Sequence, residues 1–376
     1  MKMIKLTPNS NTDIDEFRKS ISFVSSDICS VDFDNGNFFI GISSQGNEEK
    51  IKDDLVHMMA KYRTNSDDKE CFFELDIQRD KYYDCYKDCG IYSFGNGQVG
   101  FDEKGKFLLD YFDNVFYEFA KELGAIEKLY PVMLPIDAYL MTGYIKKSPQ
   151  YVIFCSSLKD SIDTLEGTYE AVKNKRVNEE IKEAEYALSP SACFHVYLEY
   201  QNRELAQDTL ITFRQNVFRN EGRLNYSEKG RLCDYYVREI VMIGSYEYCL
   251  FIRDKFMKWS ANLMERTGLS GDISLASDSF VLPKMQKYRK IQQIDKSKYE
   301  MHLSIGKDET LSTASYNLHG KAFTDPFNIS VKDVDTVTAC IGFGLQRFVL
   351  AFFSQYGSDE EKWPEKVKNA YKARMS

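Results

Sequence analysis

The sequence lacks any long uninterrupted apolar stretch. No run approaches the about 18 residues that a membrane-spanning helix requires, and the first residues, MKMIKLTPNSNTDID, contain no apolar signal segment. The chain has nine cysteines, but they form no dense or regular framework of the kind that disulfide-rich secreted domains use. We therefore expect free thiols, no membrane contact and a reducing, cytoplasmic location.

Blocks of lysine and arginine are also absent. The net charge of -8 comes from charges of mixed sign, which disfavours wide contact with a nucleic-acid backbone but leaves room for a local basic patch. The four histidines form no metal-ligand pattern, and the sequence has no internal repeat. At 376 residues and 43% hydrophobic composition, the chain can bury one large core with a smaller companion domain.

The first 85 residues (1–85) predict a small α+β unit. Two strand-like runs flank an Asp-Asn-Gly turn, a helix with apolar residues every four positions covers residues 47–63, and a short strand follows at 71–77. The unit contains no catalytic cluster, so its role stays open. Residues 86–376 are expected to form the larger domain, with a charged helical arm over residues 159–186.

The larger domain shows mixed helix and strand patterns. A helix is predicted from Lys106 to Leu123, because aromatic and apolar residues recur every four positions and Gly124 supplies a stop. The aromatic residues after Cys193 are of β type. Further strand-like runs cover residues 151–157, 273–280, 298–305 and 311–320. Mostly antiparallel strands with interspersed helices indicate an α+β fold rather than a doubly wound sheet.

The segment 213–240 predicts a long hairpin. Arg219 and Glu221 are two residues apart on its first arm, which places both side chains on one face of a strand. Its middle is rich in turn residues and is basic at Arg223, Lys229 and Arg231. Such a hairpin suits an anionic ligand that carries phosphate.

Three short motifs, in this order, resemble the catalytic core of class II aminoacyl-tRNA synthetases. The helix followed by YPVMLP is similar to the first motif, with Pro131 or Pro135 as its proline. VFRNEGR through YYVREI is similar to the second, and GFGLQR, which ends at Arg347, is similar to the third. The resemblance extends from roughly Cys89 to Gly357 and implies an antiparallel sheet flanked by helices and a homodimer.

The resemblance also implies roles for four residues in ATP binding. Arg219 would contact the α-phosphate, Glu221 would lie beside the adenine, and Arg347 would bind the far side of ATP. Both arginines would act in catalysis by neutralising charge as pyrophosphate leaves. Glu300 falls where the family keeps an acid, which implies help in holding Mg²⁺.

Within this class the sequence is most similar to the rare zinc-dependent seryl-tRNA synthetases and, more closely, to their truncated relatives, the amino acid:[carrier protein] ligases. Cys193, Glu239 and Cys340 stand where those proteins keep two cysteines and a glutamate. A lone cysteine in an apolar strand is more often a small core residue, so the assignment depends on the three together. They would leave one zinc position open for the substrate's α-amino group, which makes Glu239 a substrate-binding residue as well. Asn317 falls where the seryl enzyme reads a small polar side chain.

The implied function is an ATP-dependent ligase that forms an aminoacyl-adenylate and passes a small amino acid to the phosphopantetheine thiol of a carrier protein. The acidic balance, and the short stretch of chain after Arg347, make tRNA an unexpected partner. Aminoacylation of tRNA, of the seryl type, is therefore the alternative. A catalytically silent, regulatory paralogue is a third interpretation. The identity of the amino acid stays open among glycine, alanine, serine and a non-protein amino acid.

Overall fold

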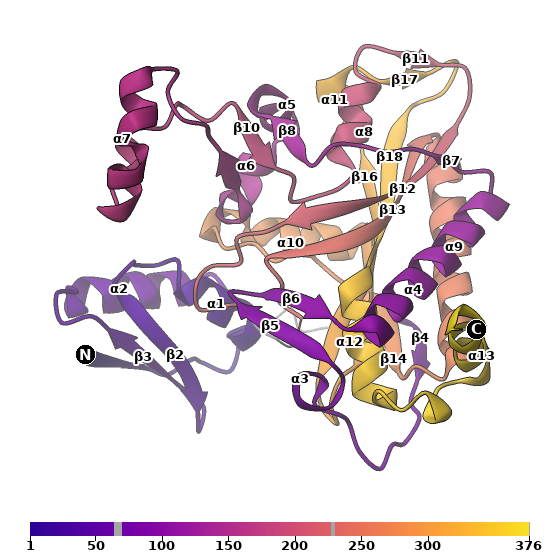
Figure 1. Cartoon of the computed structure of the whole chain (residues 1–376), viewed down its shortest axis with the longest axis horizontal. Helices are drawn as coiled ribbons and strands as arrows, with labels where there is room; N and C mark the ends of the chain where they lie inside the picture. Colours follow the sequence, from indigo (N-terminus) through magenta and orange to yellow (C-terminus); the bar gives the residue numbers. More distant parts are fainter. Residues whose placement is uncertain (64–69, 227–229, 376) are drawn as a thin grey trace.

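An eight-stranded sheet forms the centre of the computed structural model, which describes residues 1–63, 70–226 and 230–375 (Figure 1). In sheet order its strands are β4 (Cys71–Leu75), β14 (Gly271–Leu275), β15 (Lys298–Ser304), β16 (Thr310–Gly320), β18 (Val337–Gly344), β13 (Asp234–Gly244), β12 (Thr209–Phe218) and β7 (Ile126–Glu127). Neighbours are antiparallel except for the pair β12–β7. The expected α+β fold with an antiparallel sheet is confirmed.

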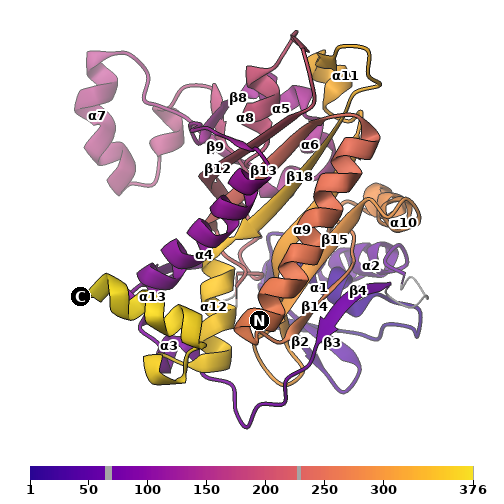
Figure 2. The same cartoon turned by 90° about the vertical axis from the view of Figure 1, so that its right-hand side faces the viewer.

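Three long helices cover one face of this sheet (Figure 2). They are α4 (Glu103–Glu122), α9 (Tyr246–Thr267) and α12 (Leu345–Tyr356). The helix predicted from Lys106 begins slightly earlier, because the side chain of Asp102 caps it by accepting from the backbone N–H of Gly105. Gly124, at φ +86°, follows its end as expected. The apolar side of the sheet, including Ile240, Tyr316 and Ile341, is fully buried against these helices.

The opposite face carries a smaller sheet and a short helix. The small sheet has the order β8 (Met133–Pro135), β10 (Tyr186–Leu188) and β9 (Ile153–Cys155). The β-type residues after Cys193 form α8 (Phe194–Glu199), so that expectation is wrong. Packing explains the difference, because Phe194, Val196 and Tyr197 are buried in one apolar cluster, and burial there outweighs strand propensity.

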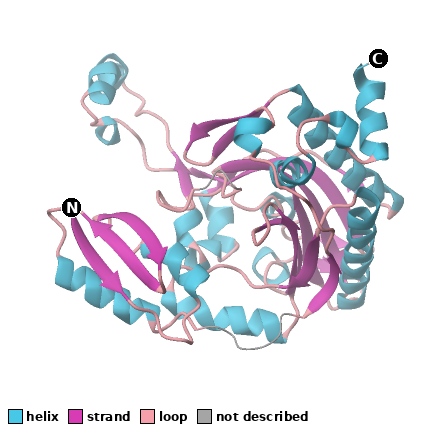
Figure 3. Cartoon of the chain, turned by 90° about the horizontal axis from the view of Figure 1, so that it is seen from below, coloured by secondary structure: helices cyan, strands magenta, loops and turns pink. Residues whose placement is uncertain are grey.

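An N-terminal unit lies beside the large sheet (Figure 3). It consists of β1 (Lys2–Leu6), α1 (Ile14–Ile21), β2 (Ile28–Asp34), β3 (Asn37–Ile42) and α2 (Glu48–Met59). Phe17, Ile40 and Leu55 belong to its own apolar cluster. Strand β4 lies within the first 85 residues but pairs with β14 of the large sheet. The division at residue 85 stays a prediction.

Helix α7 (Ile162–Lys173) extends away from the rest of the chain, within the stretch where a helical arm is expected (Figure 1). In the described part of the chain, no helix has the length and apolar character needed to cross a membrane. The remaining elements are α3 (Cys85–Asp88), β5 (Ile91–Gly95), β6 (Gln98–Phe101), α5 (Ile136–Met141), α6 (Tyr144–Lys147), β11 (Glu204–Leu205), α10 (Gln286–Ile294), α11 (Thr324–Phe327), β17 (Ser330–Val331), α13 (Glu365–Met375) and the 3-10 turns at Pro149–Tyr151, Val177–Glu179, Pro283–Met285 and Glu360–Lys362.

The core between α4 and the sheet depends on an aromatic stack. The rings of Phe116 and Phe343 are parallel with centroids 4.0 Å apart, and both are fully buried. Phe116→Ala should lower the free energy of unfolding by about 3–5 kcal/mol, because it leaves a cavity. Urea denaturation measures this loss. The exposed Phe94→Ala should change stability by less than about 0.5 kcal/mol, and equal losses in the two variants would contradict the assignment of this core.

Candidate functional site

Cys193, Glu239 and Cys340 come together on the face of the sheet opposite the long helices. Their two Sγ atoms and a carboxylate oxygen all lie within 4.8 Å of one another, and all three residues are buried. In the register of β13 and β18, Glu239 is opposite Gly342 and Cys340 is opposite Val241. Opposite residues of an antiparallel pair share a face, so the sheet itself aims Glu239 and Cys340 to one side.

Gly342 makes space for the Glu239 carboxylate. A Cβ atom at this position would lie 2.9 Å from Oε2 of Glu239 and 3.3 Å from Cγ1 of Val237. The glycine of the GFG sequence therefore has a role that is separate from turn formation. It allows a carboxylate from the neighbouring strand to come close to the backbone of β18.

The electrostatics of this cluster suit a bound cation. Burial raises the pKa of Glu239 well above its usual range, and the nearby Cys193 thiolate raises it further. The contact with Cys193, together with burial, also raises the pKa of Cys340. Three buried anions would repel one another unless a positive charge lies between them. Two thiolates and one carboxylate are a donor set that fits zinc.

Polar side chains surround the cluster. The Asn317 amide donates to Sγ of Cys340 at 3.7 Å and to Oγ of Ser315 at 3.2 Å. His319 Nε2 lies 3.6 Å from the Cys340 Sγ, and burial lowers the pKa of His319 to about 4. Ser191 Oγ lies 3.4 Å from the Cys193 Sγ. The structure thus places Asn317 beside the cluster, where the sequence predicts a substrate contact.

The two arginines assigned to ATP both lie close to one aromatic ring. The guanidinium carbons of Arg219 and Arg347 are 5.8 and 5.0 Å from the centre of the Tyr235 ring. Arg219 also donates through Nε to the backbone oxygen of Pro190 at 2.9 Å, in the loop that leads to Cys193. Glu221 is buried. Arg347 and Pro190, which are distant in the sequence, thus lie beside residues of the hairpin. Residues 227–229 of this hairpin lie outside the described part of the chain.

Glu300 lies in a charged cluster that the sequence analysis missed. Its carboxylate is 2.8 Å from Nζ of Lys298 and 3.4 Å from Nε2 of His302. Lys298 also contacts Asp278 at 2.6 Å. Burial works to raise the pKa of Glu300, but the two cationic neighbours hold it well below its usual range. The alternation of Lys298, Glu300 and His302 with apolar residues was the signal that could have revealed this cluster.

The register of the sheet connects the charged cluster to the cysteines. Cys340 on β18 is opposite Asn317 on β16, and Asn317 is opposite Lys298 on β15. The three therefore share one face, and Lys298 lies two strand spacings, about 10 Å, from the backbone of Cys340. Cys340, the Asn317 amide and the charged cluster around Lys298 thus lie on three neighbouring strands of the sheet.

Comparisons with known proteins indicate relatives for this arrangement. No family model matches the chain. The type-2 serine–tRNA ligase of Methanococcus aeolicus is 28% identical over 293 residues, which is 73% of this chain and 56% of that relative. The chain of Methanocaldococcus jannaschii with the same description is 28% identical over 272 residues, 68% of this chain and 52% of its own length. This chain thus spans about half the length of the curated relatives it matches.

One solved structure is similar over nearly the whole chain. It is M. kandleri SerRS in complex with A. aeolicus tRNASec, with a TM-score of 0.73, 18% identity and coverage of 99% of this chain and 77% of that one. At this identity the likeness shows the fold alone.

The relatives correct the expected acceptor. They are tRNA ligases, so the expectation of transfer to a carrier protein is wrong, and so is the expectation that tRNA is an unlikely partner. The seryl-type alternative is better supported. The net charge of -8 was misleading, because a total charge does not describe the local surface that an RNA contacts. The chain has the fold of the class II aminoacyl-tRNA synthetase catalytic core and is related to the type-2 serine–tRNA ligases.

Proposed function

We propose that this chain activates serine with ATP and transfers it to tRNA. The observation that carries the proposal is the meeting of Cys193, Glu239 and Cys340 on the face of the sheet where Arg219 and Arg347 both lie close to Tyr235. The relatives named serine–tRNA ligases support serine as the amino acid and tRNA as the acceptor. A homodimer and a cytoplasmic location remain predictions.

The buried triad would hold zinc and fix one end of the amino acid. A zinc ion there supplies an open coordination position that can take an α-amino group. Asn317, whose amide lies 3.7 Å from Cys340 Sγ, would donate a hydrogen bond to a short hydroxyl side chain. This arrangement would select a small polar substrate with a free amine, and it would hold the substrate carboxylate in a fixed direction.

The hairpin would hold ATP and stabilise the charge that develops during activation. In that step a carboxylate oxygen of the amino acid attacks the α-phosphorus of ATP. The bond between the α-phosphorus and the oxygen that bridges it to the β-phosphorus breaks, and pyrophosphate leaves. Arg219 and Arg347 would neutralise the phosphate charge from two sides. Glu221 would contact the adenine, and Glu300, whose two oxygens contact Lys298 and His302, would help to hold Mg²⁺.

The purified chain should exchange pyrophosphate into ATP in the presence of serine and should charge a seryl-accepting tRNA. Cys193→Ser should lose bound metal and reduce exchange at least 10- to 100-fold, the scale of altered metal sites. The exposed Cys29→Ser is the matched control and should keep both. Elemental analysis and exchange kinetics measure the two effects.

Two outcomes of these assays would reject the proposal. Absence of exchange with serine, glycine and alanine would favour the silent, regulatory interpretation. Exchange with serine but no charging of any tRNA would support the activation of serine and would reject tRNA as the acceptor.

Gly342→Ala should displace the Glu239 carboxylate, because its new Cβ would lie 2.9 Å from Oε2. We expect metal affinity to fall about 10- to 100-fold while the melting temperature changes little. Titration with a chelator measures the affinity. Gly167→Ala on α7 is the control, because a Cβ there has no atom within 4 Å. Unchanged affinity in Gly342→Ala would contradict the role of Glu239 as a ligand.

A further inference from the structure

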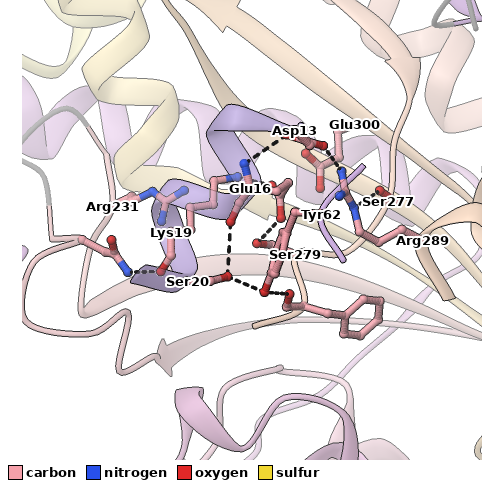
Figure 4. A network of polar contacts seen from close by, with 12 residues as sticks. Asp13, Glu16, Lys19, Ser20, Tyr62, Arg231, Ser277, Ser279, Arg289 and Glu300 are labelled. Carbon is pink, nitrogen blue, oxygen red and sulfur yellow. Dashed lines mark hydrogen bonds and ion pairs between the residues drawn. The ribbon is translucent and has the colours of Figure 1, made fainter. Parts of the chain in front are cut away.

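Helix α1 of the N-terminal unit lies between two parts of the catalytic core. On one side it contacts Asn225 of the hairpin over residues 213–240, and on the other it contacts the loop after β14 at Ser279 and, through its N-cap Asp13, Arg289 on α10 (Figure 4). Figure 4 shows Glu16 and Lys19 on α1 and its N-cap Asp13, together with Ser277 and Ser279 of this loop and Arg289 on α10. The unit therefore contacts both the hairpin and the segment after β14 through α1 and the residues that flank it.

On the hairpin side, one amide links the N-terminal unit to a residue assigned to ATP. The Asn225 amide donates to the backbone oxygen of Lys19 at 2.7 Å and to Oγ of Ser22 at 3.3 Å. The same amide donates to the backbone oxygen of Glu221 at 2.8 Å. Asn225 thus joins the end of α1 directly to the backbone that aims the Glu221 carboxylate.

Apolar contact and a cation reinforce this junction. Gly222 has φ +85°, and a Cβ there would lie 2.5 Å from Cζ of Phe23, so the Phe23 ring lies directly on the glycine backbone. The guanidinium of Arg223 donates to the backbone oxygens of Ser26, at 2.6 Å, and of Ile28. The basic side chain of Arg223 therefore faces the N-terminal unit in this structure.

On the other side, Asp13, Glu16 and Tyr62 of the N-terminal unit contact the segment that follows β14. Arg289 Nη2 is 2.7 Å from a carboxylate oxygen of Asp13, and the Ser279 hydroxyl donates to Glu16 at 2.6 Å. The Tyr62 hydroxyl donates to the backbone oxygen of Val281 at 2.6 Å. This loop also carries Asp278, the partner of Lys298, so the contacts reach the charged cluster on the sheet.

We propose that the N-terminal unit is a positioning element for the nucleotide site, and that Asn225 is the residue through which it acts. The proposal builds on the proposed function in one respect, that ATP binds beside Glu221. A turn-rich hairpin samples many conformations when free, and ordering it on binding costs affinity. The contacts from α1 order the backbone at residues 221–225 before ATP arrives.

The test compares ATP binding by full-length variants on the two sides of the junction. Calorimetry with MgATP should show a Kd about 3- to 10-fold higher for Asn225→Ala, the scale of a few lost hydrogen bonds. Phe23→Ala, on the N-terminal unit and outside the site, should act in the same direction. The exposed Asn328→Ala, whose amide pairs with Asn202, is the matched control and should leave the Kd unchanged.

The kinetic pattern separates positioning from general loosening. In serine-dependent exchange, Asn225→Ala should raise the KM for ATP and change the KM for serine less than twofold. If folded Asn225→Ala binds ATP as tightly as the unaltered chain, or if both KM values rise equally, the inference fails and the proposed function stands. If the unaltered chain binds no ATP, both fail. Asn225→Ala leaves the core of the N-terminal unit intact, so it decides the matter even if Phe23→Ala unfolds that unit.

Discussion

The burial of three acidic ligands at one point on a sheet is the constraint on which the site depends. Cys193, Glu239 and Cys340 are all shielded from water, and their ligand atoms lie within 4.8 Å of one another. Such a group is unfavourable without a compensating charge. The pairing of β13 with β18 places Glu239 and Cys340 on the same face. Gly342 leaves the space that the Glu239 carboxylate occupies, because a Cβ there would lie 2.9 Å from Oε2.

One hairpin joins this cluster to the residues that we propose bind ATP. Its first arm leads to Arg219 and Glu221, and its second arm, β13, carries Glu239. Arg219 also bonds to the loop before Cys193. Because β12 and β13 are paired from Thr209 to Phe218, the sheet fixes the base of the hairpin, and Arg219 and Glu221 follow directly after the paired part. Two reactants held at the hairpin's two ends would meet in a fixed register.

Much of the fold could be predicted from local patterns, and much of the site from the resemblance. The helix after Asp102 and the strands that carry Glu239 and Asn317 have clear periodicity and stops. The helix after Cys193 could not be predicted, since aromatic residues favour strands until tertiary packing decides otherwise. The partners of Lys298, and the contacts of α1 with Asn225, join distant segments, so no local pattern reports them. The expectation of a carrier protein relied on total charge, which does not describe the charge of any local surface.

X-ray absorption at the zinc edge tests the central claim most directly, because it reports the atoms bound to the metal. The account predicts one zinc per chain with two sulfur neighbours at about 2.3 Å and oxygen or nitrogen neighbours at about 2.0 Å. Cys340→Ser should reduce the sulfur count from two to one or release the metal. A chain purified without zinc that gains none on incubation with it, or a zinc with four sulfur neighbours or none, would contradict the account.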